Sequence, residues 1–499
     1  MFIGAHKWSL PDLDISPPAG AANQDTLHPR SQAKANATSR LYHRLLQRTV
    51  SDGIRTEASE FLHGQLSRID RRATSLPEAH SELEDWMTAT AHNAACRYSA
   101  YLAERKAGAP RRYFSNRSHA LYFLRSVAPT KLVDGAWLFG LMSNWRNPRL
   151  THLVRTYLEE LGEGSADKNH VLIYRQLLQR HGIDPNEKLD EAFYTQGLIQ
   201  LCLACNAEEF LPEIIGFNLG YEQLPLHLLI TAHELDELGL DPYYFTLHIT
   251  VDNPDAGHAR RAVQAVMDTL PKFGNEEEFW QRVRLGSQLG DAGIDTCAVI
   301  DGFDIEREVH RIFKHKSAAG QGVHSNFCRV GGRHVNDWLA QPDEMPVFLA
   351  ELEKAGWIKR GEPAESSRFW GLLQGPRAEM FGVFSSYELQ LIHDWIRGDA
   401  SVDGAPYDRS SNVKKESRLA TFRAATRLAS VQGCKADHRS TLSSAPDSDS
   451  DAQDLLRQLH TMSDAGQYKL LVKAMSPDSH WTPAGLLATR LFCRQMALQ

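Results

Sequence analysis

Residues 115–290 constrain the fold more than any other part of the chain, because they repeat helical patterns with short connections. Apolar side chains recur three and four residues apart, glycine or proline closes most segments, and the β-branched alternation that favours strands is scarce. These segments can bury their apolar faces against one another, so the sequence predicts a compact all-α bundle of about seven or eight helices. The predicted helices are Ser118–Val127, Lys131–Ser143, Leu150–Leu161, Asn169–Arg180, Glu187–Cys205, Pro212–Leu238 with a break or restart at Pro225, one starting near Tyr243, and His258–Leu270.

The chain outside this bundle carries other patterns. Residues 356–373 predict two short strands around a polar turn, and Ser385 with Glu388 forms a capping box that opens a helix through Ile396. The predicted fold class is therefore mainly α, with a small additional α+β module and a C-terminal helical segment. The predicted parts are a flexible N-terminal arm at 1–38, an N-terminal helical region at 39–112, the bundle at 113–290, the accessory α+β module at 291–400, a linker at 401–452 and C-terminal helices at 453–499.

Composition narrows the class of protein. Hydrophobic residues make up 42% of the 499 residues and charged residues 23%, which excludes a wholly disordered, collagenous or membrane-embedded chain. The net charge of −7 gives no reason to expect nucleic acid or acidic membranes as partners. The seven cysteines are scattered and odd in number, so a disulfide framework is not expected. With no secretory signal or apolar span in the sequence, we expect a cytoplasmic protein.

The sharpest chemical pattern is His248 followed four residues later by Asp252. This spacing puts an imidazole and a carboxylate on one helical face, where they can chelate a metal ion. His258 follows, and Asp255 competes with it, because Pro254 and Gly257 break regular helical geometry. The alternative is a histidine packed in the core and an aspartate at a solvated helix end.

A second pattern is acidic. Glu159, Glu160 and Glu163 surround a two-glycine turn, and His170 follows in the first turn of the next helix. The helix dipole disfavours carboxylates at a helix C-terminus, and a bound cation would compensate them. An ordinary acidic helix end beside a surface histidine is the alternative.

A third pattern is Glu222, a lone acid in the apolar stretch FNLGYEQLPLHLLI. A buried carboxylate must be paired, neutralised or bound to a metal, whereas a glutamate at a solvated edge needs no partner. His227 and His233 are rival ligands nearby, although they need different faces. The three patterns together supply mixed imidazole and carboxylate ligands that suit a dinuclear iron or manganese site in a helical core. These ligands are Glu160, His170, Glu222, His248, Asp252 and His258.

As a set, these residues resemble the haem-oxygenase-like di-iron oxidases and oxygenases, a family of iron-containing redox enzymes. The resemblance covers about residues 115–290 and is carried by EELGEG with His170, LGYEQ with Glu222, YYFTLHITVD with His248 and Asp252, and His258. It implies a seven-helix fold and two Fe(II) ions bound by these side chains, with O2 as co-substrate. Family members act on small metabolites such as amines, amino acids or fatty acids by N-oxygenation, desaturation or C–C cleavage.

The sequence departs from the family pattern at the last ligand, because His258 follows Asp252 by six residues instead of three. Either a local bulge brings His258 inward or Asp255 replaces it. Some members use a further carboxylate on the preceding helix, for which Asp134 is the equivalent here, and Glu163 is a substitute for Glu160. Aromatic residues expected around the pocket are Tyr221, Tyr243, Tyr244 and Phe245.

The resemblance leads us to expect a small-molecule substrate and an electron donor, with a homodimer as a further possibility and with neither nucleic acid nor membrane as partner. Two other functions stay open: a non-catalytic interaction or regulatory protein on the same helical scaffold, and a metal-independent enzyme on it. Other patterns favour ordinary structural roles. They are Cys202-x-x-Cys205 as core cysteines, Gly320-x-Gly322 without a preceding strand, the solvated tract of His310, His315 and His324, and the basic WIKRG stretch with Arg377.

Overall fold

A computed structural model of the chain describes residues 36–47, 49–70, 74–322, 324–325, 327–374, 378–398 and 449–497. The chain divides into the units Met1–Ala37 and Thr38–Gln499, and of the first unit only residues 36 and 37 are described. Nearly all of the predicted arm at 1–38 and of the linker at 401–452 lies outside the described residues, as does Arg377.

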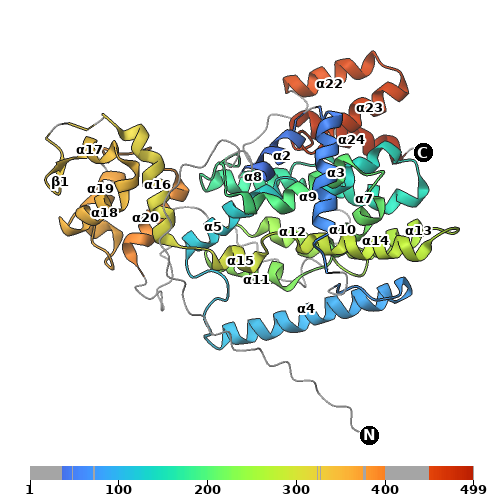
Figure 1. Cartoon of the computed structure of the whole chain (residues 1–499), viewed down its shortest axis with the longest axis horizontal. Helices are drawn as coiled ribbons and strands as arrows, with labels where there is room; N and C mark the ends of the chain where they lie inside the picture. The colour runs from blue at the N-terminus through green and yellow to red at the C-terminus, as the bar shows by residue number, and fades with distance from the viewer. Residues whose placement is uncertain are drawn as a thin grey trace, which may run out of the picture. The chain divides into compact units, whose positions relative to one another are not determined.

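The described residues are mainly helical, as predicted. Their only strands are two residues long each and pair in a single hairpin (Figure 1). The bundle region begins at α5 and ends with α14, and short 3-10 helices occupy several of its turns. Its elements are α5 (Arg117–Ser126), α6 (Ala128–Lys131), η2 (Ala136–Asn144), η3 (Pro148–Leu150), α7 (Thr151–Glu160), η4 (Gly162–Gly164), α8 (His170–Arg180), η5 (Glu191–Tyr194), α9 (Thr195–Cys205), α10 (Leu211–Tyr221), α11 (Leu226–Glu237), α12 (Tyr243–Val251), α13 (His258–Thr269) and α14 (Glu276–Gln288).

Further elements precede and follow the bundle, and all of them are helices except the strands β1 and β2. Those before it are α2 (Ala37–Leu45), α3 (Asp52–Leu66), η1 (His80–Glu82) and α4 (Leu83–Lys106). Those after it are η6 (Leu289–Asp291), α15 (Thr296–Asp301), α16 (Ile305–Gly320), β1 (Arg329–Val330), β2 (Arg333–His334), α17 (Val335–Leu339), η7 (Pro342–Glu344), α18 (Met345–Lys354), η8 (Ala364–Ser366), α19 (Arg368–Leu373), α20 (Ser386–Arg397), α22 (Ser450–His460), α23 (Asp464–Ala474) and α24 (Pro483–Ala497).

Two local predictions are wrong. The predicted strands at residues 356–373 are instead a turn, η8 and α19, because Phe369 and Leu373 are buried with the four-residue spacing of a helix. The hairpin lies earlier, where the turn residues Gly331 and Gly332 have φ of 59° and 78° between β1 and β2. The predicted helix Lys131–Ser143 is broken after Lys131 and resumes as the 3-10 helix η2.

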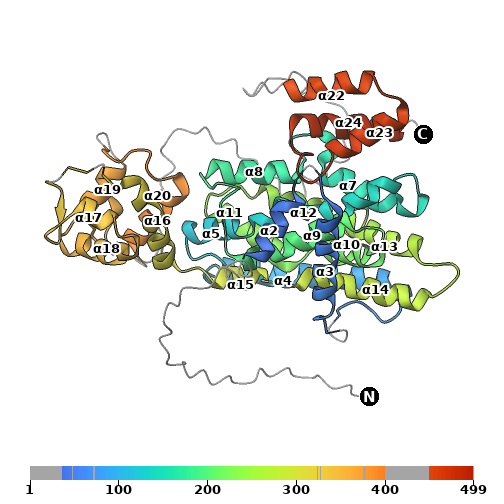
Figure 2. The ribbon, with the colours of Figure 1, turned by 45° about the horizontal axis from the view of Figure 1, so that its top comes forward.

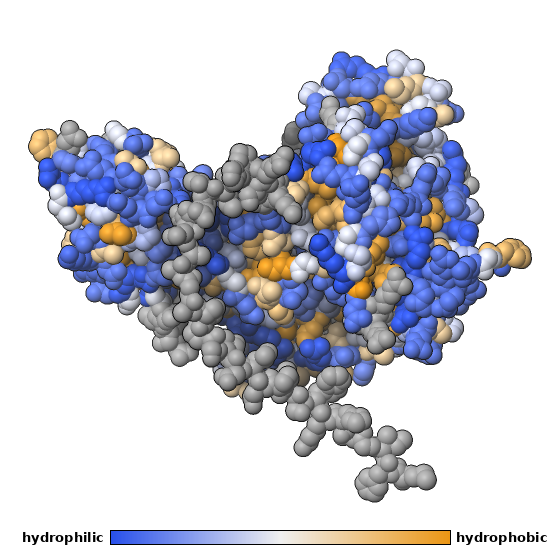
Figure 3. Space-filling model, viewed as in Figure 1, coloured by the Kyte–Doolittle hydropathy of each residue, from blue (hydrophilic) through white to orange (hydrophobic). Residues whose placement is uncertain are grey.

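The apolar core of the bundle includes side chains from α24 as well as from its own helices, for example Phe492, whose ring centroid lies 5.2 Å from that of Trp145. Helix α24 contacts η4, the short turn after α7, and it is drawn close to α7 in both Figure 1 and Figure 2. The face drawn in Figure 3 is mostly hydrophilic, with apolar residues in small groups. Among the described residues, we find no helix with both the length and the apolar character that a bilayer crossing requires.

Candidate metal centre

Asp134 and Glu160 approach each other because a glycine lies beside them. Asp134 occupies the turn between α6 and η2, and Glu160 is the last residue of α7. Gly135 has φ of 77°, and a Cβ placed on it would lie 2.8 Å from the Glu160 Cβ. The left-handed backbone and the missing side chain therefore both favour glycine at this position. This requirement also breaks the helix that periodicity predicted at Lys131–Ser143.

A tight turn between α12 and α13 brings His258 inward. The Asn253 side chain accepts hydrogen bonds from the backbone N–H groups of Asp255, Ala256 and Gly257 at 3.0–3.2 Å. The turn ends at His258, the first residue of α13, which is 1% exposed. Of the two alternatives left open by the sequence, the structure has the bulge that buries His258, and it leaves Asp255 exposed.

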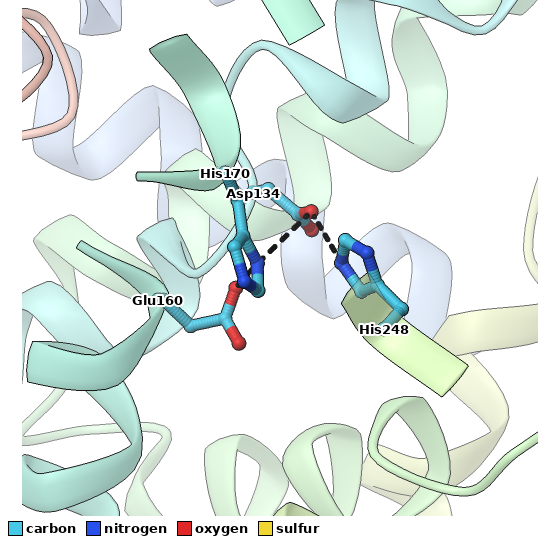
Figure 4. A group of neighbouring side chains, drawn as sticks. All are labelled: Asp134, Glu160, His170 and His248. Atoms are coloured by element: carbon cyan, nitrogen blue, oxygen red, sulfur yellow. Dashed lines mark hydrogen bonds and ion pairs between the residues drawn. The ribbon is translucent and has the colours of Figure 1, made fainter. Parts of the chain in front are cut away.

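Four side chains form a first group, drawn in Figure 4: Asp134, Glu160, His170 and His248. Each offers one ligand atom, and these atoms all lie within 4.8 Å of one another. Asp134 Oδ2 is 3.1 Å from His248 Nε2 and 4.0 Å from His170 Nδ1, which is in turn 2.6 Å from Glu160 Oε2. Three separate stretches of the bundle thus converge with α12 on one buried point.

A second group consists of Glu160, Glu222 and His258. His258 Nδ1 lies 3.1 Å from Glu222 Oε2 and 3.2 Å from Glu160 Oε1. Asp252, at the end of α12, places its Oδ1 3.4 Å from the same nitrogen. Glu160 belongs to both groups and faces them with different oxygens, Oε2 towards His170 and Oε1 towards His258. A carboxylate placed in this way can bridge two ions.

One unpartnered atom agrees with a bound cation. Glu222 Oε1 is buried without a hydrogen-bond partner. Buried polar atoms are almost always satisfied, so an unsatisfied carboxylate oxygen in the second group points to a missing ligand. Mixed imidazole and carboxylate donors suit iron or manganese.

Two histidines are oriented as metal-bound histidines usually are. His248 Nδ1 lies 2.8 Å from the carbonyl oxygen of Tyr244, so it donates there and Nε2 is left to face Asp134. His258 Nε2 lies 3.1 Å from Glu159 Oε2, which leaves Nδ1 for the second group. A ligand histidine characteristically gives its other N–H to a carbonyl or carboxylate in this way.

Electrostatics also favours a bound cation. Burial raises the pKa of Asp252 to about 7, and burial likewise raises the pKa of Glu222. At Glu160 burial is outweighed by His170 and His258, which hold the pKa of that carboxyl well below its usual range. Four buried carboxylates at one place repel one another, and divalent cations would relieve this repulsion.

The expected pocket residues lie close to the centre but differ in what they contact. The Tyr244 hydroxyl donates a hydrogen bond to Asp134 Oδ2. Tyr221 stacks on Phe217, with ring centroids 4.8 Å apart, and Phe245 is a buried apolar side chain. Tyr243 is 43% exposed, and its hydroxyl donates to the carbonyl oxygen of Asp167.

The substitute ligands lie apart from both groups. The Glu163 side chain is 45% exposed and pairs with Arg155 at 3.2 Å. His233 Nε2 lies 3.3 Å from Glu237, and neither it nor His227 belongs to the metal-ligand groups of the described residues. Cys202, one half of the CxxC pattern, is a fully buried free cysteine.

Two residues near the centre have roles that the sequence did not predict. Glu159 belongs to the acidic pattern but not to the predicted ligands, and it accepts hydrogen bonds from His258 and Arg261. Lys131 places its Nζ 5.8 Å and 5.7 Å from the ring centroids of Tyr221 and Tyr244. Burial opposes its charge, but nearby carboxylates, Asp134 above all, raise the pKa of Lys131. In the sequence, Lys131 was only the first residue of the predicted helix Lys131–Ser143.

Comparison with known proteins agrees with this geometry. Residues 121–291 match the model of a family described as "Iron-containing redox enzyme". No curated protein and no solved structure was found to match the chain. The matched residues, about a third of the chain, contain every member of both groups and Asp252. Residues 121–291 are thus similar to the iron-containing redox enzymes, whose fold is haem-oxygenase-like.

Proposed function

We propose that the chain is a non-haem di-iron enzyme that uses O2 to oxidise or oxygenate a small metabolite. The observation that carries the proposal is Glu160, whose two oxygens face two groups of possible ligands. The preferred substrate is an amine or an amino-acid-derived compound, converted by N-oxygenation or oxidative cleavage, and this choice rests on the family alone. An external electron donor completes the proposed system.

In this proposal, one ion is held by Asp134, Glu160, His170 and His248, and the other by Glu160, Glu222 and His258 with Asp252. Bound Fe(II) would supply the electrons that reduce O2. The chain itself supplies orientation and exclusion of water. The Tyr244 hydroxyl fixes the Asp134 carboxylate, the Tyr244 carbonyl fixes the His248 ring, and Glu159 fixes the His258 ring.

Anaerobic loading with Fe(II) tests the proposal. After removal of free metal, we expect about two iron ions per chain and a higher melting temperature, because a ligand that binds only the folded state stabilises it. Elemental analysis and thermal unfolding measure both effects. A well-folded chain that retains no iron would overturn the proposal and favour a non-catalytic or metal-independent protein.

Oxygen consumption by the iron-loaded chain then identifies the substrate class. A panel of amines, amino acids and fatty acids should contain a compound that accelerates O2 uptake above the rate without substrate, because the proposed reaction couples O2 reduction to substrate oxidation. The chain loaded with zinc, which has no accessible redox change, is the control and should consume no O2.

A further inference from the structure

The C-terminal segment (residues 449–497) lies outside the family match but reaches the turn between Glu160 and His170. Helix α24 packs on η4, and Arg490 donates a hydrogen bond to the carbonyl oxygen of Gly164 at 2.8 Å. Gly164 has φ of 82°, and a Cβ there would lie 2.4 Å from the Leu486 carbonyl oxygen. The turn thus has the backbone and the missing side chain that close contact with α24 requires.

Asn169 connects this segment to both sides of the turn. It is fully buried, and its Oδ1 accepts the Leu172 N–H at 2.9 Å as the N-cap of α8. Its Nδ2 donates to the carbonyl oxygen of Leu161 at 3.2 Å and lies 3.1 Å from His480 Nδ1. Leu161 follows Glu160 and Asn169 precedes His170, so one side-chain amide ties the ends of the two helices that carry these ligands.

His480 completes the bonding of that amide. An amide nitrogen can only donate, so His480 Nδ1 must accept and the ring must be neutral. Burial favours the neutral ring, since it lowers the pKa of His480 to about 3. The next residue, Trp481, is held by Arg175 of α8, whose guanidinium lies 3.8 Å from the ring centroid. The histidine is therefore fixed to α8 by two neighbouring contacts.

We propose that His480 is a positioning residue that holds Glu160 and His170 in their metal-binding arrangement through Asn169, so that the centre is complete only with the C-terminal segment in place. The inference rests on the proposed function, because it concerns the same centre. It adds a requirement for a residue far from residues 121–291 in the sequence.

Three substitutions of His480 in the full chain test this role. His480→Asn keeps an acceptor oxygen at the place of Nδ1, whereas His480→Gln moves the acceptor towards Nε2 and His480→Ala removes it. We expect His480→Ala and His480→Gln to weaken Fe(II) affinity by about 10–100-fold, and His480→Asn to restore affinity close to that of the original chain. Anaerobic titration with Fe(II) measures the affinity, and the visible spectrum of the Co(II)-loaded chain reports the ligand arrangement. His460→Ala, at an exposed histidine of the same segment, is the control and should change neither.

The outcomes separate the two proposals. Normal affinity and an unchanged Co(II) spectrum in His480→Ala and His480→Gln would overturn the positioning role alone. Absence of iron uptake by the original chain would overturn the proposed function. If His480→Ala does not fold, the comparison of His480→Asn with His480→Gln decides, because both keep a polar side chain and equal effects of the two would contradict a role for the acceptor at Nδ1.

Discussion

Glu160→Gln should remove both iron ions from the chain. The carboxylate is 3% exposed and is shared by the two groups, with Oε2 2.6 Å from His170 and Oε1 3.2 Å from His258. Glutamine keeps the volume but replaces one ligand oxygen with an NH2 group that cannot bind a metal and removes the negative charge. We expect iron affinity to fall on the order of 100-fold or more at both positions, measured by elemental analysis after anaerobic loading.

Two further variants make this result specific. Glu163→Gln, three residues away at an exposed position, should retain both ions. His248→Ala should lose the ion of the first group, because His248 belongs to that group and not to the second. Helix content by circular dichroism should be unchanged in all three variants. Retention of both ions by Glu160→Gln would show that Glu160 does not bridge and would contradict the ligand assignment.

The helices of this bundle could be predicted wherever the local sequence determines them. The predicted helix Asn169–Arg180 corresponds to α8, His170–Arg180, because Asn169 is the N-cap and the apolar spacing continues through the helix. The predicted helix Lys131–Ser143 failed because Gly135 adopts a left-handed backbone beside Glu160, which is distant in sequence. No local pattern reveals such a contact.

The candidate centre likewise combines residues that local patterns reveal with residues that only tertiary packing places. The spacing of His248 and Asp252, and the turn after Glu160, were visible as patterns, and the structure brings the six predicted ligands together. That they bind metal stays a prediction. Asp134 was placed only through the family resemblance, although it lies in the middle of the first group. The turn that contains Asp134 has no second possible ligand at a metal-binding spacing. The position of Asp134 depends on packing between helices that are distant in sequence.

Neither the role of His480 nor the contact of Glu159 with His258 could be predicted from the sequence, although Glu159 was visible in the acidic pattern. His480 lies more than 300 residues after Asn169 and acts through a single side-chain contact. Glu159 contacts His258 across the bundle, at a sequence separation of 99 residues. Tertiary packing determines which residues orient the ligands, and a single sequence carries no periodic or spacing signal for them.

Asp252→Asn should stabilise the metal-free chain at alkaline pH. Burial raises the pKa of Asp252 from 3.8 to about 7, so the folded chain keeps a proton that the unfolded chain releases. Between these two values stability falls as pH rises, because the folded state binds more protons than the unfolded state. From about pH 5 to about pH 8 this carboxyl alone should cost the original chain about 2–3 kcal/mol of unfolding free energy.

Asparagine at position 252 does not bind or release this proton, so the variant lacks this contribution to the pH dependence of stability. Relative to the original chain, Asp252→Asn should therefore gain stability between about pH 5 and about pH 8 by a similar amount, measured by urea unfolding of metal-free protein. Asp255→Asn is the matched control, because Asp255 is exposed and its removal should change stability by less than about 0.5 kcal/mol. A constant difference between Asp252→Asn and the original chain across this pH range would contradict a buried carboxyl of raised pKa.

Bound iron should make the original chain more stable than Asp252→Asn, the reverse of their order without metal. Ionised Asp252 can serve the second ion, whereas asparagine offers a neutral and weaker oxygen ligand, so saturating Fe(II) should stabilise the original chain more than Asp252→Asn at about pH 8. The same carboxylate that destabilises the metal-free fold would then stabilise the loaded one. If Asp252→Asn is the more stable chain with and without iron, Asp252 is a buried acid without a metal, and the second group binds its ion through Glu160, Glu222 and His258 alone.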